Sequence, residues 1–89
     1  MATTTHHTEI LHEYTAHFQD ANGTSYTVRA HGDHRDDGMW EGWLEFQPVD
    51  GGLPRRTGRE TTQPNRESLV YWASGLEPIY FEGAFERAG

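Results

Sequence analysis

The sequence of 89 residues contains no cysteine and no lysine, and it has no long hydrophobic run. Without cysteine, disulfide bonds, a thiol nucleophile and a zinc–thiolate site are excluded. No apolar stretch approaches the roughly 20 residues that a membrane-spanning helix needs. The start, MATTTHHTEI, also lacks the basic and apolar pattern of a secretory signal. We therefore expect a cytoplasmic protein with no membrane partner.

Positive charge is also scarce in this chain. Fourteen carboxylates oppose seven arginines, which gives a formal net charge of −7. Proteins that bind nucleic acid generally carry a basic surface, and anionic membranes attract the same kind of surface. Neither nucleic acid nor a membrane is therefore an expected partner.

Aromatic rings supply much of a small hydrophobic content. Apolar residues make up 34% of the chain, but they include three Trp, four Phe and four Tyr. A domain of this length buries only about 60% of its unfolded surface, so its core is marginal. Because disulfides are excluded, oligomerisation is the usual remaining way to support such a core. We expect one domain over residues 1–89, a disordered tail over residues 1–8, and a homodimer.

Three segments alternate apolar and polar residues with the period of a β-strand. Residues 14–18 and 26–30 flank DANG and predict a hairpin in which Phe18 faces Tyr26, Ala16 faces Val28 and Tyr14 faces Ala30. This register requires an odd loop, with Asp20 opening a type I turn and Gly23 as a left-handed bulge residue. Residues 40–46 predict a third strand that ends at Pro48. Trp43 falls on the polar face of that strand, so a strand, the chain end or a partner must cover it.

The second half of the chain predicts an edge strand followed by a helix. Residues 55–62 hold no large apolar side chain and favour an extended edge. Helix signals follow over residues 65–74, where Leu69, Trp72, Ala73 and Leu76 form an apolar stripe. Gly75 is expected in the left-handed position after the last turn. Residues 78–87 match both periods, and Ile79, Phe81, Gly83 and Phe85 favour a strand over a helix.

The predicted fold is α+β: an antiparallel sheet of four to five strands with one helix on one face, in the order ββββαβ. A ten-residue helix is about 15 Å long. It cannot cover such a sheet alone, which leaves part of a face bare or paired with a second subunit.

The string AHGDHRDDG is the most enzyme-like feature. His31, Asp33 and His34 could supply nitrogen and oxygen ligands to a metal, and the stretch His31–Asp37 could serve a small metal-dependent or acid/base enzyme. We prefer a solvated loop between strands. No catalytic residue and no cofactor is predicted.

Four of the seven arginines lie within twelve residues and form the best binding candidate: Arg55, Arg56, Arg59 and Arg66. With Glu60 they give a local charge of +3, which leaves the rest of the chain at −10. Such an edge could hold a carboxylate or phosphate of a small anionic ligand, or acidic residues of a protein partner or second subunit, with Trp43 as apolar anchor. The alternative is pairing with the chain's own carboxylates.

The segment GRETTQPNRESLVYWASGLEPIYFEGAFERA resembles the C-terminal part of a group of short, uncharacterised bacterial proteins. The resemblance covers about a third of the chain and implies a bacterial domain of unknown function. It implies no activity and no site residue. From the sequence we expect a small non-catalytic binding or interaction domain, homodimeric, with the enzyme above as the alternative.

Overall fold

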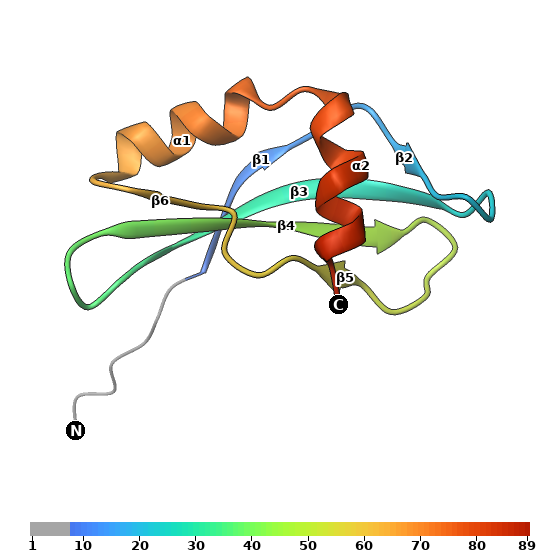
Figure 1. Cartoon of the computed structure of the whole chain (residues 1–89), viewed down its shortest axis with the longest axis horizontal. Coiled ribbons are helices and arrows are strands. Elements are labelled where there is room, and N and C mark those ends of the chain that lie inside the picture. Colours follow the sequence, from blue (N-terminus) through green and yellow to red (C-terminus); the bar gives the residue numbers. More distant parts are fainter. Residues whose placement is uncertain (1–7) are drawn as a thin grey trace.

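The computed structural model describes residues 8–89 and shows an α+β fold, with a six-stranded antiparallel sheet and two C-terminal helices (Figure 1). The strands are β1 (Glu9–Glu13), β2 (Phe18–Gln19), β3 (Ser25–His34), β4 (Trp40–Pro48), β5 (Arg55–Arg56) and β6 (Thr61–Gln63). The helices are α1 (Arg66–Gly75) and α2 (Pro78–Arg87). The α+β class is as predicted, but the strand count and the last element were wrong. The predicted tail over residues 1–8 lies outside the described residues, except for Thr8.

The long strands β3 and β4 form the centre of the sheet and pair along their whole length, from Tyr26 opposite Pro48 to His34 opposite Trp40. β1 and β2 pair with the free side of β3, and β5 and β6 pair with the free side of β4. The backbone between β5 and β6 stays attached to β4, because the Thr57 N–H donates to Leu44 O at 2.9 Å. The predicted edge strand over residues 55–62 therefore exists, in two pieces.

The predicted turn between β2 and β3 is confirmed. The Gly23 N–H donates to Asp20 O at 3.0 Å, and Gly23 has a φ of 84°. The Asp20 Oδ1 atom accepts the backbone N–H groups of Asn22 and Thr24, both at 2.9 Å. An aspartate that holds two turn N–H groups and a glycine free to adopt positive φ explain why the chain reverses here.

The register beyond that turn was predicted only in part. Phe18 lies opposite Tyr26, as expected. The other predicted pairs are wrong, because β1 places His12 opposite Ala30, and the Tyr14 N–H donates to Val28 O at 3.0 Å. The Tyr14 hydroxyl donates to Ala73 O of α1 at 2.6 Å, and this bond holds the Tyr14 side chain against the helix.

Helix α1 follows its predicted cap and stripe. The Asn65 side chain accepts the Ser68 N–H at 2.8 Å and begins the helix. Leu69 and Ala73 are buried and face the sheet. One detail was wrong: Gly75 is the last helical residue and lacks a positive φ, and the chain leaves the helix in extended backbone at Leu76.

Residues 78–87 form helix α2, not the expected strand. Pro78 occupies the first turn, where its missing N–H costs no hydrogen bond. Phe81 and Ala84 are buried, at helical spacing, whereas Ile79 is 84% exposed. A strand would have placed Ile79 and Phe81 on the same face. The helix is favoured over the strand because α1 alone leaves part of the sheet uncovered, and α2 covers that part with Phe81.

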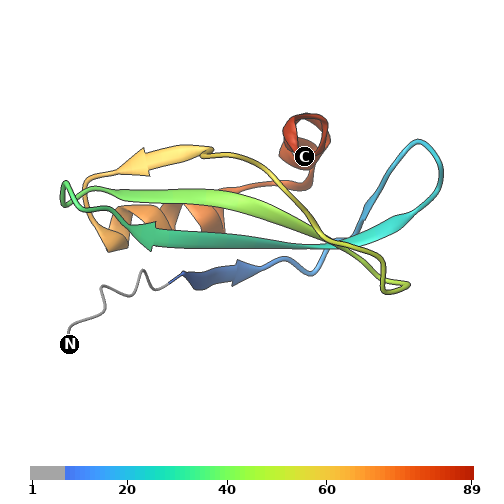
Figure 2. The same cartoon turned by 90° about the horizontal axis from the view of Figure 1, so that it is seen from below.

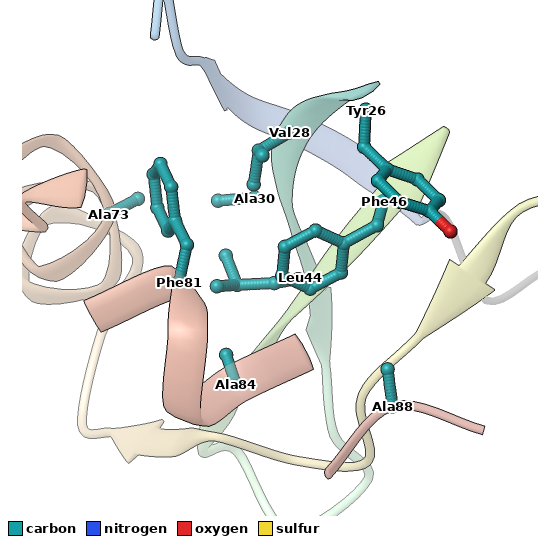
Figure 3. Close-up of a cluster of buried hydrophobic side chains, with 9 residues drawn as sticks. All are labelled: Tyr26, Val28, Ala30, Leu44, Phe46, Ala73, Phe81, Ala84 and Ala88. Atoms are coloured by element: carbon teal, nitrogen blue, oxygen red, sulfur yellow. The ribbon is translucent and has the colours of Figure 1, made fainter. Parts of the chain in front are cut away.

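Both helices lie on the same face of the sheet, with α1 running along the strands and α2 crossing them (Figures 1 and 2). The core lies between these layers (Figure 3) and contains Tyr26, Val28, Ala30, Leu44, Phe46, Ala73, Phe81, Ala84 and Ala88. Beneath α1 the sheet carries two glycines, Gly32 directly opposite Gly42. Their missing side chains let Leu69 approach the backbone closely.

Candidate functional site

The four arginines of the predicted binding edge do not form one cluster. Arg55 turns toward α2, where its Nη2 donates to Ala88 O at 3.3 Å and its guanidinium lies 4.2 Å from the centre of the Phe85 ring. Arg66 makes two bonds to the Glu9 carboxylate, at 2.7 and 3.0 Å, and joins α1 to β1. These bonds lower the pKa of Glu9. Both arginines therefore make contacts within the fold, Arg66 with a carboxylate and Arg55 with a backbone carbonyl and a ring.

The other two arginines of the stretch lie on different parts of the surface. The Arg56 guanidinium lies 4.6 Å from the centre of the Trp43 ring, on the sheet face that the helices leave open. Arg59 is exposed, between β5 and β6, and contacts no partner within residues 8–89. The four arginines therefore do not form the row of hydrogen-bond donors for one anion that their spacing in the sequence suggested.

Trp43, the predicted anchor, is covered by its own chain. The ring is only 6% exposed and stacks on His31 of β3, with centroids 6.0 Å apart and planes 8° from parallel. Arg56 covers it from β5. The His31 Nε2 atom lies 3.2 Å from the Glu45 Oε1 atom. Neighbouring strands thus supply the cover that Trp43 required, and little apolar ring surface remains for a partner.

The possible metal ligands lie on β3 rather than on a loop, and they do not converge. His31 lies opposite Trp43 and Asp33 opposite Glu41, on the open face. His34, an odd number of residues away, lies on the other face and stacks on Trp40, with ring centroids 4.5 Å apart. Within residues 8–89, no group of three or more His, Asp or Glu side chains is arranged to hold a metal ion. The alternation of side chains along a strand separates them.

The buried carboxylate of Glu60 attaches α2 to the sheet. The sequence did not indicate this structural role. The Glu60 side chain is 5% exposed, accepts the Tyr80 hydroxyl at 2.5 Å, and receives two bonds from Arg87, at 2.6 and 3.1 Å. Burial raises the pKa of Glu60, but bonds from Arg87, Tyr80 and Thr57 outweigh it and leave the pKa lowered. No local pattern reveals this network, because its partners are 20 and 27 residues away.

A groove of about 490 Å³ lies between α2 and the β2–β3 hairpin. Its volume falls within the range of about 300–1,000 Å³ that is typical of ligand sites. Its lining combines two half-buried rings with short polar and acidic side chains: Phe18, Gln19, Asp20, Ala21, Glu82, Phe85 and Glu86. The rings of Phe18 and Phe85 are 4.8 Å apart and belong to the aromatic cluster around Phe46. The floor of the groove is thus packed directly on the core.

The groove carries negative charge and no basic lining residue. Asp20 is occupied by the turn, but Glu82 and Glu86 have no hydrogen-bonding or ion-pair partner among residues 8–89. Two like charges four residues apart destabilise a helix by about 0.2–0.5 kcal/mol. Glu86 also lies in the last turn, where the helix dipole disfavours a carboxylate. The two glutamates therefore do not serve the stability of α2.

Sequence reasoning missed this groove because it assigned residues 78–87 to a strand. In a strand, Glu82 and Glu86 carry no special relation to the hairpin. In a helix, spacings of three and four place both on the same side as Phe85, whereas in a strand Phe85 lies on the opposite face from them. The usable signal was therefore the helical alternative for this segment.

Comparisons of the chain with protein-family models, with curated proteins and with solved structures found no match. The resemblance of residues 58–88 to short bacterial proteins accordingly stays a prediction. Among residues 8–89, neither helix has the length and apolar character needed to cross a membrane.

Proposed function

We propose that this chain is a non-catalytic binding domain that holds a partner in the groove between α2 and the β2–β3 hairpin. The observation that carries the proposal is the groove itself, where Phe18 and Phe85 line an open surface while Tyr26, Phe46 and Phe81 of the same core are buried. Apolar surface held rigidly beside unpaired charge is typical of recognition sites.

The enzyme alternative receives less support from the geometry. An acid/base or metal-dependent site in the stretch His31–Asp37 needs converging side chains, whereas β3 directs them to opposite faces. Among the ion-paired acids of residues 8–89, the Glu60 carboxylate is the most deeply buried, but Tyr80 and Arg87 already occupy it. Neither location offers an open volume beside an available acid or base.

Self-association is a second part of the proposal. It rests on the small core and on apolar side chains exposed beyond β4, where Val49 is 54% and Leu53 is 89% exposed. The exposed Arg56 and Arg59 follow that loop in the sequence and supply positive charge to this surface. Sedimentation of the wild-type chain across micromolar concentrations tests this part, and a strict monomer would discard the homodimer.

The groove is tested by blocking it without disturbing the core. Ala21 is exposed at the groove wall, so Ala21→Trp adds a ring there. As the control, Thr62→Trp adds the same ring to an exposed position of β6, opposite Glu41 at the end of β4 far from the hairpin. The probes are three short synthetic peptides with identical apolar residues and basic, neutral or acidic flanks. At least one peptide should shift the backbone amide signals of residues 18–21 and 82–86. Ala21→Trp should abolish the shifts and Thr62→Trp should preserve them. If no peptide moves these signals, the proposed function is wrong.

A further inference from the structure

We infer that the occupant of the groove is a basic, apolar segment of another protein, an inference that rests on the proposed function. A lysine or arginine of the partner would lay its aliphatic stem on Phe18 and Phe85 and bring its charge to Glu82 and Glu86. Long cationic side chains bury their stems on apolar surface while the charged end stays at a polar rim. The groove offers both parts side by side.

Charge complementarity selects this class of partner. The lining contains three carboxylates and no basic residue, and Glu82 and Glu86 have no partner among the described residues. An acidic segment would meet like charges here, and a neutral apolar segment would leave both glutamates uncompensated. A cation removes the repulsion between Glu82 and Glu86 when it binds.

One of the two groove rings, Phe85, already makes a cation–π contact within the chain. The Arg55 guanidinium lies 4.2 Å from the centre of the Phe85 ring, within the range of a cation–π contact. Phe85 also lines the groove, where part of its surface stays open. A second cation that reaches the open part would be held by the same ring and by the carboxylates beside it.

A second copy of this chain is a poor occupant, because its own cations are in use. Six of the seven arginines contact a partner within residues 8–89, and these are Arg29, Arg35, Arg55, Arg56, Arg66 and Arg87. Arg59 is the exception, and its neighbours in sequence are Gly58 and Glu60. Within residues 8–89 the one arginine without a partner therefore has no apolar neighbour in sequence, which favours a segment of a different protein.

The experiment measures the binding of the basic, neutral and acidic peptides to the full chain from changes in amide chemical shifts. The same measurement is made on a variant in which the charge of the groove is reversed. In the wild type the basic peptide should bind most tightly and weaken as sodium chloride is raised. Glu82→Lys combined with Glu86→Lys should weaken the basic peptide about tenfold or more and strengthen the acidic one. The control pair Asp36→Lys and Glu67→Lys changes net charge equally, at exposed carboxylates outside the groove lining, and should leave binding within about twofold.

The outcomes separate this inference from the proposed function. Equal binding of all three peptides in the groove would overturn the cationic partner class and keep the binding domain. No binding by any peptide would overturn both. Equal weakening by the control pair would show nonspecific attraction to an acidic protein and reject the inference. A wild-type dimer that Ala21→Trp dissociates would assign the groove to a second copy and reject it as well. Circular dichroism of each variant confirms that it is folded.

Discussion

The close approach of α1 to the sheet predicts that an added methyl group at Gly42 destabilises the protein. A Cβ atom built at Gly42 would lie 2.8 Å from Trp72 Cζ3 and 3.0 Å from Leu69 Cδ1. Favourable carbon–carbon contacts lie at about 3.5–4.0 Å. Leu69 is fully buried, so it has little room to yield, and the helix or the strand must move.

The magnitude follows from two opposing effects of Gly42→Ala. Forcing extra volume into a packed core costs about 1–3 kcal/mol. Replacing a glycine restricts the unfolded chain and returns about 0.4–1 kcal/mol. We expect a net loss of about 1–2 kcal/mol, which is a substantial share of the stability of a small domain. Gly32→Ala should behave alike, because its Cβ would lie 2.7 Å from Leu69 Cδ2 and 2.8 Å from Leu11 Cδ1.

Urea denaturation followed by circular dichroism measures these changes, with Gly58→Ala as the matched control. A Cβ atom at Gly58 meets no atom within 4 Å, and Gly58 lacks a positive φ. The control should therefore be as stable as the wild type, or more stable by a few tenths of a kcal/mol. A Gly42→Ala variant as stable as the Gly58→Ala control would refute the argument that the paired glycines admit α1.

Three further predictions concern the turn, the helix stripe and the buried carboxylate. Gly23→Val should lower the free energy of unfolding by about 1–2 kcal/mol, because a β-branched residue resists a φ of 84°; an unchanged denaturation midpoint would reject the bulge as a determinant of stability. Trp72→Ala should cost about 3 kcal/mol, at the low end for such changes because the ring is only half-buried, and thermal melting tests this. Glu60→Gln should lose about 1–3 kcal/mol at neutral pH through weaker bonds to Arg87. The folded-state pKa of Glu60 lies below its ordinary value of 4.5, so the wild-type advantage exists above that pH and disappears as pH falls through the folded-state pKa. Denaturation at a series of pH values should show the two proteins converging in acid, and a constant difference would contradict the assignment.

Local chemistry made several elements of this fold predictable. Asp20 and Gly23 specify the turn between β2 and β3 through contacts within four residues of each other. Asn65 begins α1 through a bond to the backbone three residues ahead. Alternation over β4 and the spacing of Leu69 and Ala73 marked which faces are buried. In each case the determining contacts are close in sequence, so a short window contains them.

The candidate groove could not be predicted from short stretches of sequence. Residues 78–87 satisfy the period of a strand and of a helix, and only the uncovered sheet beside α1 decides between them. Once the helix is chosen, Phe85 meets Phe18 across 67 residues of chain, and Glu82 and Glu86 come to flank them. The sequence alone contains the residues of this groove but not their juxtaposition.

The sequence by itself determined the α+β class, the hairpin turn, the long strand β4 and helix α1, because propensity, capping and side-chain period act over a few residues. Tertiary structure alone decided that residues 78–87 are a helix, that Trp43 is covered by His31 and Arg56, and that Arg55 and Arg66 serve the fold. Those outcomes depend on which surfaces remain open after the sheet forms. An arginine takes the nearest carboxylate, carbonyl or ring in space, and distance in space is set by packing of the whole chain.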